Sequence, residues 1–133
     1  MFIEETDLGS SIYNEVLQAI TREIPNHINE KIVLAIDEAD SYLNTRYDTT
    51  TLWTQTGTDR NALIKNAVID IALYHIHAVL EEVPVIRRER YDYAKTTLKD
   101  IRKGETVLHS IPRLSDTEPE NTEIKYGGIS KRY

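Results

Sequence analysis

Apolar side chains recur at helical spacing along two stretches of the chain and fill a third. In residues 26–47 they fall three and four residues apart, on one stripe of an α-helix, at Ile28, Ile32, Ala35, Ile36, Ala39 and Leu43. Residues 84–104 repeat this pattern at Ile86, Ala94, Leu98 and Ile101. Residues 62–80 are apolar on almost every side, which a helix tolerates only where other elements cover it. The pattern predicts an all-α fold, a small bundle of four main helices around a central apolar helix.

The first two helices are predicted from their stripes and capping residues. Residues 7–23 carry an i, i+4 stripe that begins at Leu8, with Thr6 or Asp7 as the expected N-cap. Pro25 ends this segment, because a proline disfavours helical backbone in the residue before it. Asn26 is then expected to cap a second helix that runs to about Thr45.

The two later helices are delimited in the same way. Asp59 is expected to cap a third helix over residues 60–81. Pro84 suits the first turn of a fourth helix, where its missing N–H is no loss. Gly104, directly after Arg102 and Lys103, suits the left-handed C-cap that ends it.

Two segments lack a helical period. Residues 47–59 are rich in threonine and are predicted to form a loop or a short hairpin, with Leu52 and Trp53 as its large apolar residues. Residues 105–133 contain prolines, a Gly-Gly pair and few large apolar groups, which cannot bury enough surface to offset their ordering entropy. The chain is therefore predicted to consist of a helical domain, 1–104, and an extended or mobile C-terminal tail, 105–133.

Charge is distributed unevenly along the chain. The net charge is −6, from 22 acidic and 16 basic residues. Residues 84–103 nevertheless hold seven bases and three acids. One cationic helix therefore lies on an otherwise anionic protein. It is either a solvated face, with its bases favoured near a helix C-terminus, or a contact surface for an acidic neighbour.

Composition excludes several classes of site and narrows the compartment. The chain has no cysteine, so disulfides, thiolate zinc sites and cysteine nucleophiles are excluded. The acidic N-terminus lacks the basic and apolar regions of a signal peptide. Residues 62–80 approach the length of a membrane span, but Lys65, Asp70 and His75 interrupt them, so we expect a core helix and no membrane partner.

The titratable residues of the central helix favour structural roles. His75 and His77 lie two residues apart, so they point to different sides of a helix and are expected to be core or boundary histidines. Asp70 lies among apolar residues and needs a partner if it is buried, for which Arg46 and Arg90 are the candidates. The alternative for Asp70 is a general base with a raised pKa. No nucleophile or acid is evidently paired with it, so we predict no catalytic residues and no enzyme.

Two charged clusters invite binding hypotheses. Asp37, Glu38 and Asp40 suggest either a magnesium cluster or a solvated acidic face, and the latter is favoured because no phosphate motif accompanies them. Arg87, Arg88 and Arg90 alternate with Tyr91 and Tyr93, a pattern that nucleic-acid-binding proteins use. The overall acidity, with a pI near 5.2, argues against that role. We therefore predict no metal and no cofactor.

An ordered set of short motifs resembles the Mu-like phage Gp36 family. The set consists of Asp40-Ser-Tyr-Leu with Arg46-Tyr47, then Asp70-Ile-Ala-x-Tyr74-His75, then Arg88-Glu-Arg-Tyr91-x-x-Ala94 leading to Leu98-x-Asp100-Ile101-x-x-Gly104. The resemblance covers about residues 26–104. It implies a structural virion protein of a phage or prophage: a head–tail connector, also called a head-completion or adaptor protein, that forms a ring below the portal and joins the DNA-filled head to the tail.

The resemblance and the charge map together imply partners and an interface. The expected partners are further copies of the chain, the portal protein, and tail or other connector proteins, with DNA only as passing genome. The expected location is the head–tail junction of the virion, and the host cytoplasm before assembly. A ring requires two different faces of each subunit to meet, and we predict contacts from Asp37, Glu38, Asp40, Arg87, Arg88, Arg90, Lys125, Tyr126, Arg132 and Tyr133.

Two other functions remain as alternatives. One is a non-catalytic regulatory binding module that recognises a peptide in a groove near Trp53. The other is a nucleic-acid-binding accessory protein that uses residues 87–103, which predicts salt-sensitive DNA binding.

Overall fold

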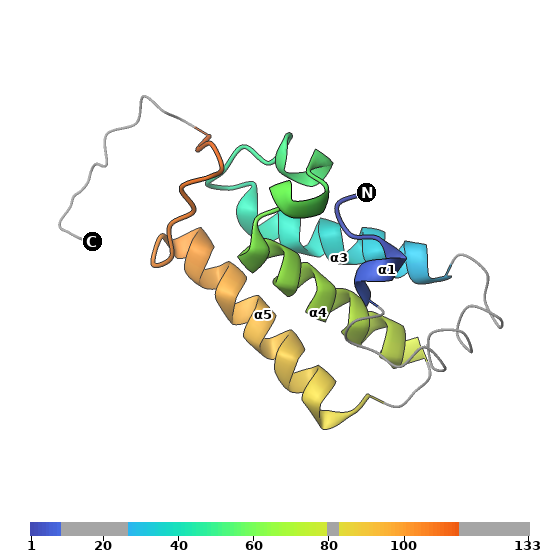
Figure 1. The fold of residues 1–133 in the computed structure, drawn as a ribbon. Coiled ribbons are helices and arrows are strands. Elements are labelled where there is room, and N and C mark those ends of the chain that lie inside the picture. Colours follow the sequence, from blue (N-terminus) through green and yellow to red (C-terminus); the bar gives the residue numbers. More distant parts are fainter. Residues whose placement is uncertain (9–26, 80–82, 115–133) are drawn as a thin grey trace.

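Helices α3 (His27–Leu43), α4 (Ala62–Val79) and α5 (Val85–Lys103) pack against one another (Figure 1). The computed structural model describes residues 1–8, 27–79 and 83–114. Within these residues the helices are α1 (Glu5–Leu8), α3 (His27–Leu43), α4 (Ala62–Val79) and α5 (Val85–Lys103). Two short 3-10 turns, Leu52–Thr54 and Gly57–Asp59, interrupt the threonine-rich loop. The prediction of an all-α bundle is confirmed, while most of the helix expected over residues 7–23 lies outside the described residues.

Helix α4 is the centre of the bundle. It packs against α3 on one side and α5 on another, and α1 also contacts it. Its buried residues lie around most of the helix: Ile64, Ala67, Val68, Ile69, Ile71, Ala72, Leu73 and Ile76. By length and composition alone α4 also qualifies as a membrane span. Here its apolar surface is covered by neighbouring helices, as the nearly uniform apolarity of residues 62–80 predicts.

The two flanking helices bury one stripe each. Helix α3 buries Ile28, Ile32, Ala35, Ala39 and Leu43. Helix α5 buries Ala94, Leu98 and Ile101. Ile86 was expected on the α5 stripe, but half of its surface is exposed, at 50%. The first turns of α5 therefore extend beyond the core, which leaves their apolar side chains in solvent.

The helix ends follow the predicted chemistry with three differences, the first being that Pro84 is the N-cap residue of α5 and not part of its first turn. Gly104 ends α5 with φ +87, the left-handed conformation predicted for it. The Arg46 guanidinium occupies the space that a Cβ at Gly104 would need. Helix α4 is capped by Asn61, whose Oδ1 accepts the Ile64 N–H at 3.0 Å, and not by Asp59. Asp7 lies inside α1 and accepts the Glu4 N–H at 2.8 Å, the reverse half of a capping box.

Residues beyond α5 pack on the helical body. Leu108 and Ile111 are buried in the same core as the helices. The backbone of Tyr47 forms an antiparallel bridge with Arg113, and the Leu108 N–H donates to the Tyr47 hydroxyl at 3.0 Å. The packed body therefore continues past the boundary predicted at Gly104, as far as the last described residues. The rest of the predicted tail, 115–133, lies outside the described residues.

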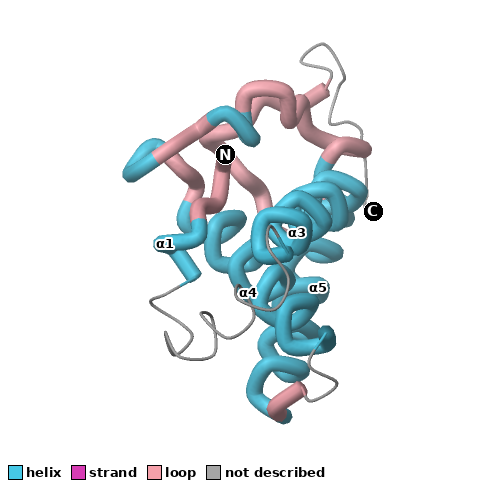
Figure 2. The backbone as a smooth tube through the Cα atoms, turned by 90° about the vertical axis from the view of Figure 1, so that its right-hand side faces the viewer, coloured by secondary structure: helices cyan, strands magenta, loops and turns pink. Residues whose placement is uncertain are grey.

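The first residues of the chain are also part of the core. Phe2 and Ile3 are fully buried, and the Phe2 ring meets the edge of Trp53 at a centroid distance of 5.1 Å. Arg60 holds this segment in place, because its guanidinium donates to the Phe2 carbonyl at 2.9 Å and to the Asp7 carboxylate at 2.8 Å. Figure 2 shows the long loops gathered at one end of the bundle, close to the N-terminus.

Candidate functional site

Glu38 is the acceptor at the meeting point of three helices. Its Oε2 accepts a hydrogen bond from the Tyr91 hydroxyl of α5 at 2.8 Å. Its Oε1 lies 2.9 Å from Nε2 of His75 on α4. Burial and the bond to this carboxylate raise the pKa of Tyr91, because both oppose loss of the phenolic proton. Glu38 was expected on a solvated acidic face, but the structure shows that it joins α3 to α4 and α5.

Aromatic rings surround this contact. The Tyr91 ring stacks on Tyr74 at 4.0 Å with an angle of only 4° between the planes, and Lys95 places its ammonium 4.5 Å from the Tyr91 centroid. His75 completes the group with an edge contact to Tyr91 at 5.7 Å. The arrangement agrees with a boundary histidine in a structural role.

Asp40 is likewise used inside the molecule. One of its carboxylate oxygens accepts from the Thr49 hydroxyl at 2.7 Å and from the Trp53 indole at 2.9 Å. Burial works to raise the pKa of Asp40, but its hydrogen bonds outweigh this effect and hold the pKa below its ordinary value. Asp40 therefore fastens the loop 47–59 to α3. Trp53, beside which the binding-module hypothesis placed a peptide groove, takes part in this contact through its indole N–H.

The three acids predicted as a group thus separate. Asp37 stays exposed, while Glu38 and Asp40 point to different partners. Among the described residues, no three histidine, aspartate or glutamate side chains are close enough to hold a metal ion.

Asp70 has a different partner from those expected. The nearest cation is Arg87 of α5, with its Nη1 3.9 Å from the Asp70 Oδ1. Burial raises the pKa of Asp70, and the nearby Arg90 and Arg87 only partly offset this. The expected pairing with Arg46 is wrong, because the Arg46 Nε donates instead to the Arg102 carbonyl at 3.1 Å. Arg90, the other expected partner, lines the same groove, and its charge lowers the pKa of Asp70.

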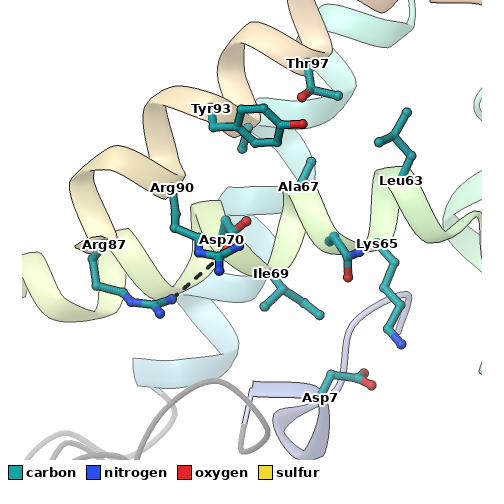
Figure 3. Close-up of a pocket in the computed structure, with 12 residues that line it drawn as sticks. Asp7, Leu63, Lys65, Ala67, Ile69, Asp70, Arg87, Arg90, Tyr93 and Thr97 are labelled. Atoms are coloured by element: carbon teal, nitrogen blue, oxygen red, sulfur yellow. Dashed lines mark ion pairs between the residues drawn. The ribbon is translucent and has the colours of Figure 1, made fainter. Parts of the chain in front are cut away.

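A groove between α4 and α5 contains this pair. Its volume is about 580 Å³, and it is lined by apolar residues and by charged ones, Lys65, Arg87 and Arg90 among them. Figure 3 shows Arg87 and Arg90 reaching from α5 towards Asp70, with Tyr93 and Thr97 further along the same helix. Asp7 of α1 also lines the groove. The sequence reasoning identified the cations of α5, but it did not place Lys65 beside them.

Two outward faces carry apolar side chains next to charges. On α3, which we call the acidic face, Val33 and Leu34 are 48% and 41% exposed, and the exposed acids Glu30 and Asp37 flank them one turn away on either side. At the start of α5, which we call the cationic end, Val85, Ile86 and Tyr93 are 71%, 50% and 69% exposed, alongside the exposed Arg88 and Arg90. Glu30, Val33, Leu34 and Asp37 lie at helical spacing, so they form one continuous stripe.

The remaining predicted interface residues, Lys125, Tyr126, Arg132 and Tyr133, lie outside the described residues.

Comparison with known proteins gives one match. The model of the family described as "Bacteriophage Mu, Gp36" matches residues 2–126, which is nearly the whole chain. No curated protein matches the chain, and no solved structure does. The match extends the resemblance noted for residues 26–104 to both ends of the helical body.

Proposed function

The chain belongs to the Bacteriophage Mu Gp36 family, and from this membership we propose that it is a non-catalytic head–tail connector. Membership makes it a phage protein. The finer role is that of a ring-forming adaptor below the portal, which joins the filled head to the tail at the head–tail junction of the virion. Its partners are further copies of itself, the portal protein and tail or connector proteins, and DNA passes without specific binding.

The observation that carries the ring is the pair of outward faces on α3 and α5. Each combines exposed apolar side chains with charges: the carboxylates of Glu30 and Asp37 lie beside Val33 and Leu34, and the guanidinium groups of Arg88 and Arg90 lie beside Val85 and Ile86. The exposed acids Glu89 and Asp92 lie among these arginines. Stable interfaces have such an apolar centre with a polar rim. Opposite charges on the rim select the correct partner and orientation.

A closed ring needs two different faces on every subunit. A head-to-tail contact places one face of a subunit against another face of the next, and rotation then closes the ring. The acidic face of α3 and the cationic end of α5 belong to different helices of one bundle, so one chain presents both. A two-fold dimer would instead need one surface that is complementary to itself.

This revises the interface predicted from charge alone. Glu38 and Asp40 are bonded within the subunit, so of the three predicted acids only Asp37 is proposed to contact a neighbour. Glu30, which the charge argument did not single out, joins it on the exposed stripe. On the cationic side Arg88 and Arg90 are exposed, although Arg90 also lines the groove with Arg87, which lies closest to Asp70.

A charge swap tests the contact. We expect the wild-type protein to assemble with increasing concentration, or on added portal protein, and the double variant Arg88→Glu with Arg90→Glu to stay monomeric. Adding Glu30→Lys and Asp37→Lys to the same chain restores opposite charges across the contact, so assembly returns. Mass by light scattering, and rings seen by electron microscopy, are the measurements.

The matched control reverses Lys99 and Lys103, which are exposed at the other end of α5. This control must assemble like the wild type. The connector role is contradicted if the chain neither assembles nor binds portal protein under any condition. Salt-sensitive binding of duplex DNA by the monomer would favour the nucleic-acid-binding alternative instead.

A further inference from the structure

The groove between α4 and α5 contains more positive charge than its own acids neutralise. Lys65, Arg87 and Arg90 line it, with Asp7 and Asp70 as its acids. Asp7 is already held by a paired contact with Arg60, at 2.8 and 3.2 Å. Lys65 still acts on Asp7 through its charge, and Asp70 is the acid that faces both Arg87 and Arg90. Within the described part of the chain, neither Lys65 nor Arg90 forms a direct ion pair.

One donor in the groove wall has no acceptor in the part of the chain that the structure describes. The Arg87 Nη1 atom is buried and makes no hydrogen bond within the described residues. Its 3.9 Å separation from the Asp70 carboxylate allows electrostatic attraction but exceeds hydrogen-bond length. A buried guanidinium nitrogen without an acceptor is costly, because it has lost water and gained nothing in exchange. The groove therefore favours a ligand that brings further carboxylate oxygens.

The chain itself contains a segment with that chemistry. Residues 116–123 carry Asp116, Glu118, Glu120 and Glu123 and include no lysine or arginine. An extended segment that bears several carboxylates can place one acid beside each cation of the groove. Its charge is thus complementary to the groove.

The segment is also tethered within reach. Leu114 lies at the end of the bundle where Gly104 ends α5, because the Leu114 N–H donates to the Arg46 carbonyl at 3.0 Å and the Arg46 side chain covers Gly104. From Gly104 back to Arg87 the helix measures about 26 Å. An extended chain from Leu114 to Glu123 spans about 30 Å. A tether of this length gives the segment a high effective concentration at the groove.

We propose that residues 116–123 bind in the α4–α5 groove of their own subunit, with their carboxylates on Lys65, Arg87 and Arg90. The segment competes there with any acidic partner, so the unassembled subunit covers its own cationic surface. This inference concerns the isolated chain and does not depend on the connector role.

A spin label on the segment tests this contact. The chain has no cysteine, so Asn121→Cys provides a single attachment site for a nitroxide. At low salt and low protein concentration, we expect a loss of NMR peak intensity for the amides of Ala67, Asp70 and Ala94, which line the groove. Raising the salt concentration should restore these intensities, because screening weakens exposed charge contacts.

Two pairs of variants separate this contact from general attraction. Lys65→Gln with Arg90→Gln should abolish the intensity loss, whereas Arg88→Gln with Lys99→Gln, which removes equal charge outside the groove, should retain it. Replacing Glu118, Glu120 and Glu123 by glutamine should also abolish the loss. This last variant leaves every described residue unchanged, so a folding defect in the groove variant does not decide the result.

Mixed samples distinguish the two origins of the segment. Spin-labelled chain without the NMR isotope is mixed with isotope-labelled chain without the spin label. Loss of intensity in the mixture equal to that in the single chain shows that a second copy provides the segment, and overturns the proposal. An absence of any loss at low salt, or a loss that persists in the groove variant, overturns it as well. All readings are taken on unassembled protein, so a failure to form rings does not affect them.

Discussion

The carboxylates of α3 and the cations around the α4–α5 groove differ in how far the fold itself satisfies them. Glu38 and Asp40 together accept hydrogen bonds from α5 and from the loop 47–59, and Glu38 also contacts the His75 ring. Around the groove, Arg87 keeps a buried nitrogen that has no acceptor among the described residues, and Arg90 remains exposed. Within the described residues, the fold satisfies these acids of α3 and leaves part of the Arg87 guanidinium without an acceptor.

This difference indicates which charges are available for partners. In the sequence, both groups look like clusters of charge on one helix. In the structure, the inward acids of α3 connect elements of one subunit, so they are unavailable to a neighbour. A charge without an internal partner is the better candidate for a contact, because binding then adds an interaction that folding left unmade.

Replacing Asp40 is the sharpest test of the satisfied side. We expect Asp40→Ala to lower the free energy of unfolding by about 3 kcal/mol, because it leaves the Trp53 indole and the Thr49 hydroxyl without their acceptor. Asp37→Ala is the matched control one turn away, and as an exposed side chain it should change stability by less than about 0.5 kcal/mol. Urea unfolding measures both. Equal effects at the two positions would remove the distinction between inward and outward acids.

The contact of Tyr91 with Glu38 should have a smaller effect. Tyr91→Phe keeps the stacking on Tyr74 and removes only the hydroxyl, so we expect a loss of about 1.5 kcal/mol for one hydrogen bond to a charged group. The control is Tyr93→Phe, because 69% of that side chain is exposed. A double-mutant cycle with Glu38→Gln isolates the pair. A coupling energy near zero would mean that Glu38 does not hold α5.

The helices themselves were predictable from the sequence. Spacings of three and four place Ile32, Ala39 and Leu43 on one buried stripe, and the left-handed Gly104 follows from its position after the last basic residues. These features depend on local chemistry, which a single sequence contains. The family resemblance, drawn from ordered motifs, is confirmed by the match over residues 2–126.

The contacts between distant segments were not predictable in the same way. Phe2 carries no periodic signal, and its burial depends on Trp53 arriving from a loop about fifty residues later. Leu108 and Ile111 are isolated apolar residues in a polar segment, yet Tyr47 and the helices provide the surface that buries them. The nearest cation to Asp70 is Arg87, and not the expected Arg46 or Arg90, because α5 lies beside α4. Each outcome depends on tertiary geometry.

Acid should weaken the satisfied side at a defined pH. The pKa of Asp40 is lowered in the folded protein, so its contribution to stability is complete above the unfolded value near 4 and is lost as pH falls through the lower folded pKa. Asp7, bonded to Arg60, should behave alike. We expect thermal stability to fall below about pH 4, and less steeply in Asp40→Asn than in Asp37→Asn. Identical acid profiles for the two variants would show that Asp40 does not contribute this loss.

Neutralising the groove should have the smallest effect on folding. Arg90 is exposed and Lys65 is partly so, and exposed charges contribute little to stability. We therefore expect Lys65→Gln with Arg90→Gln to change the free energy of unfolding by less than about 0.5 kcal/mol, as measured by urea unfolding. Removing Arg90 should also raise the pKa of Asp70 further, since its charge lowers that pKa in the folded state. A large destabilisation would mean that these cations support the fold as the acids of α3 do, and that they are not free for a ligand. If the free energy of unfolding changes little while the contact with residues 116–123 is lost, these cations contribute to binding and not to folding.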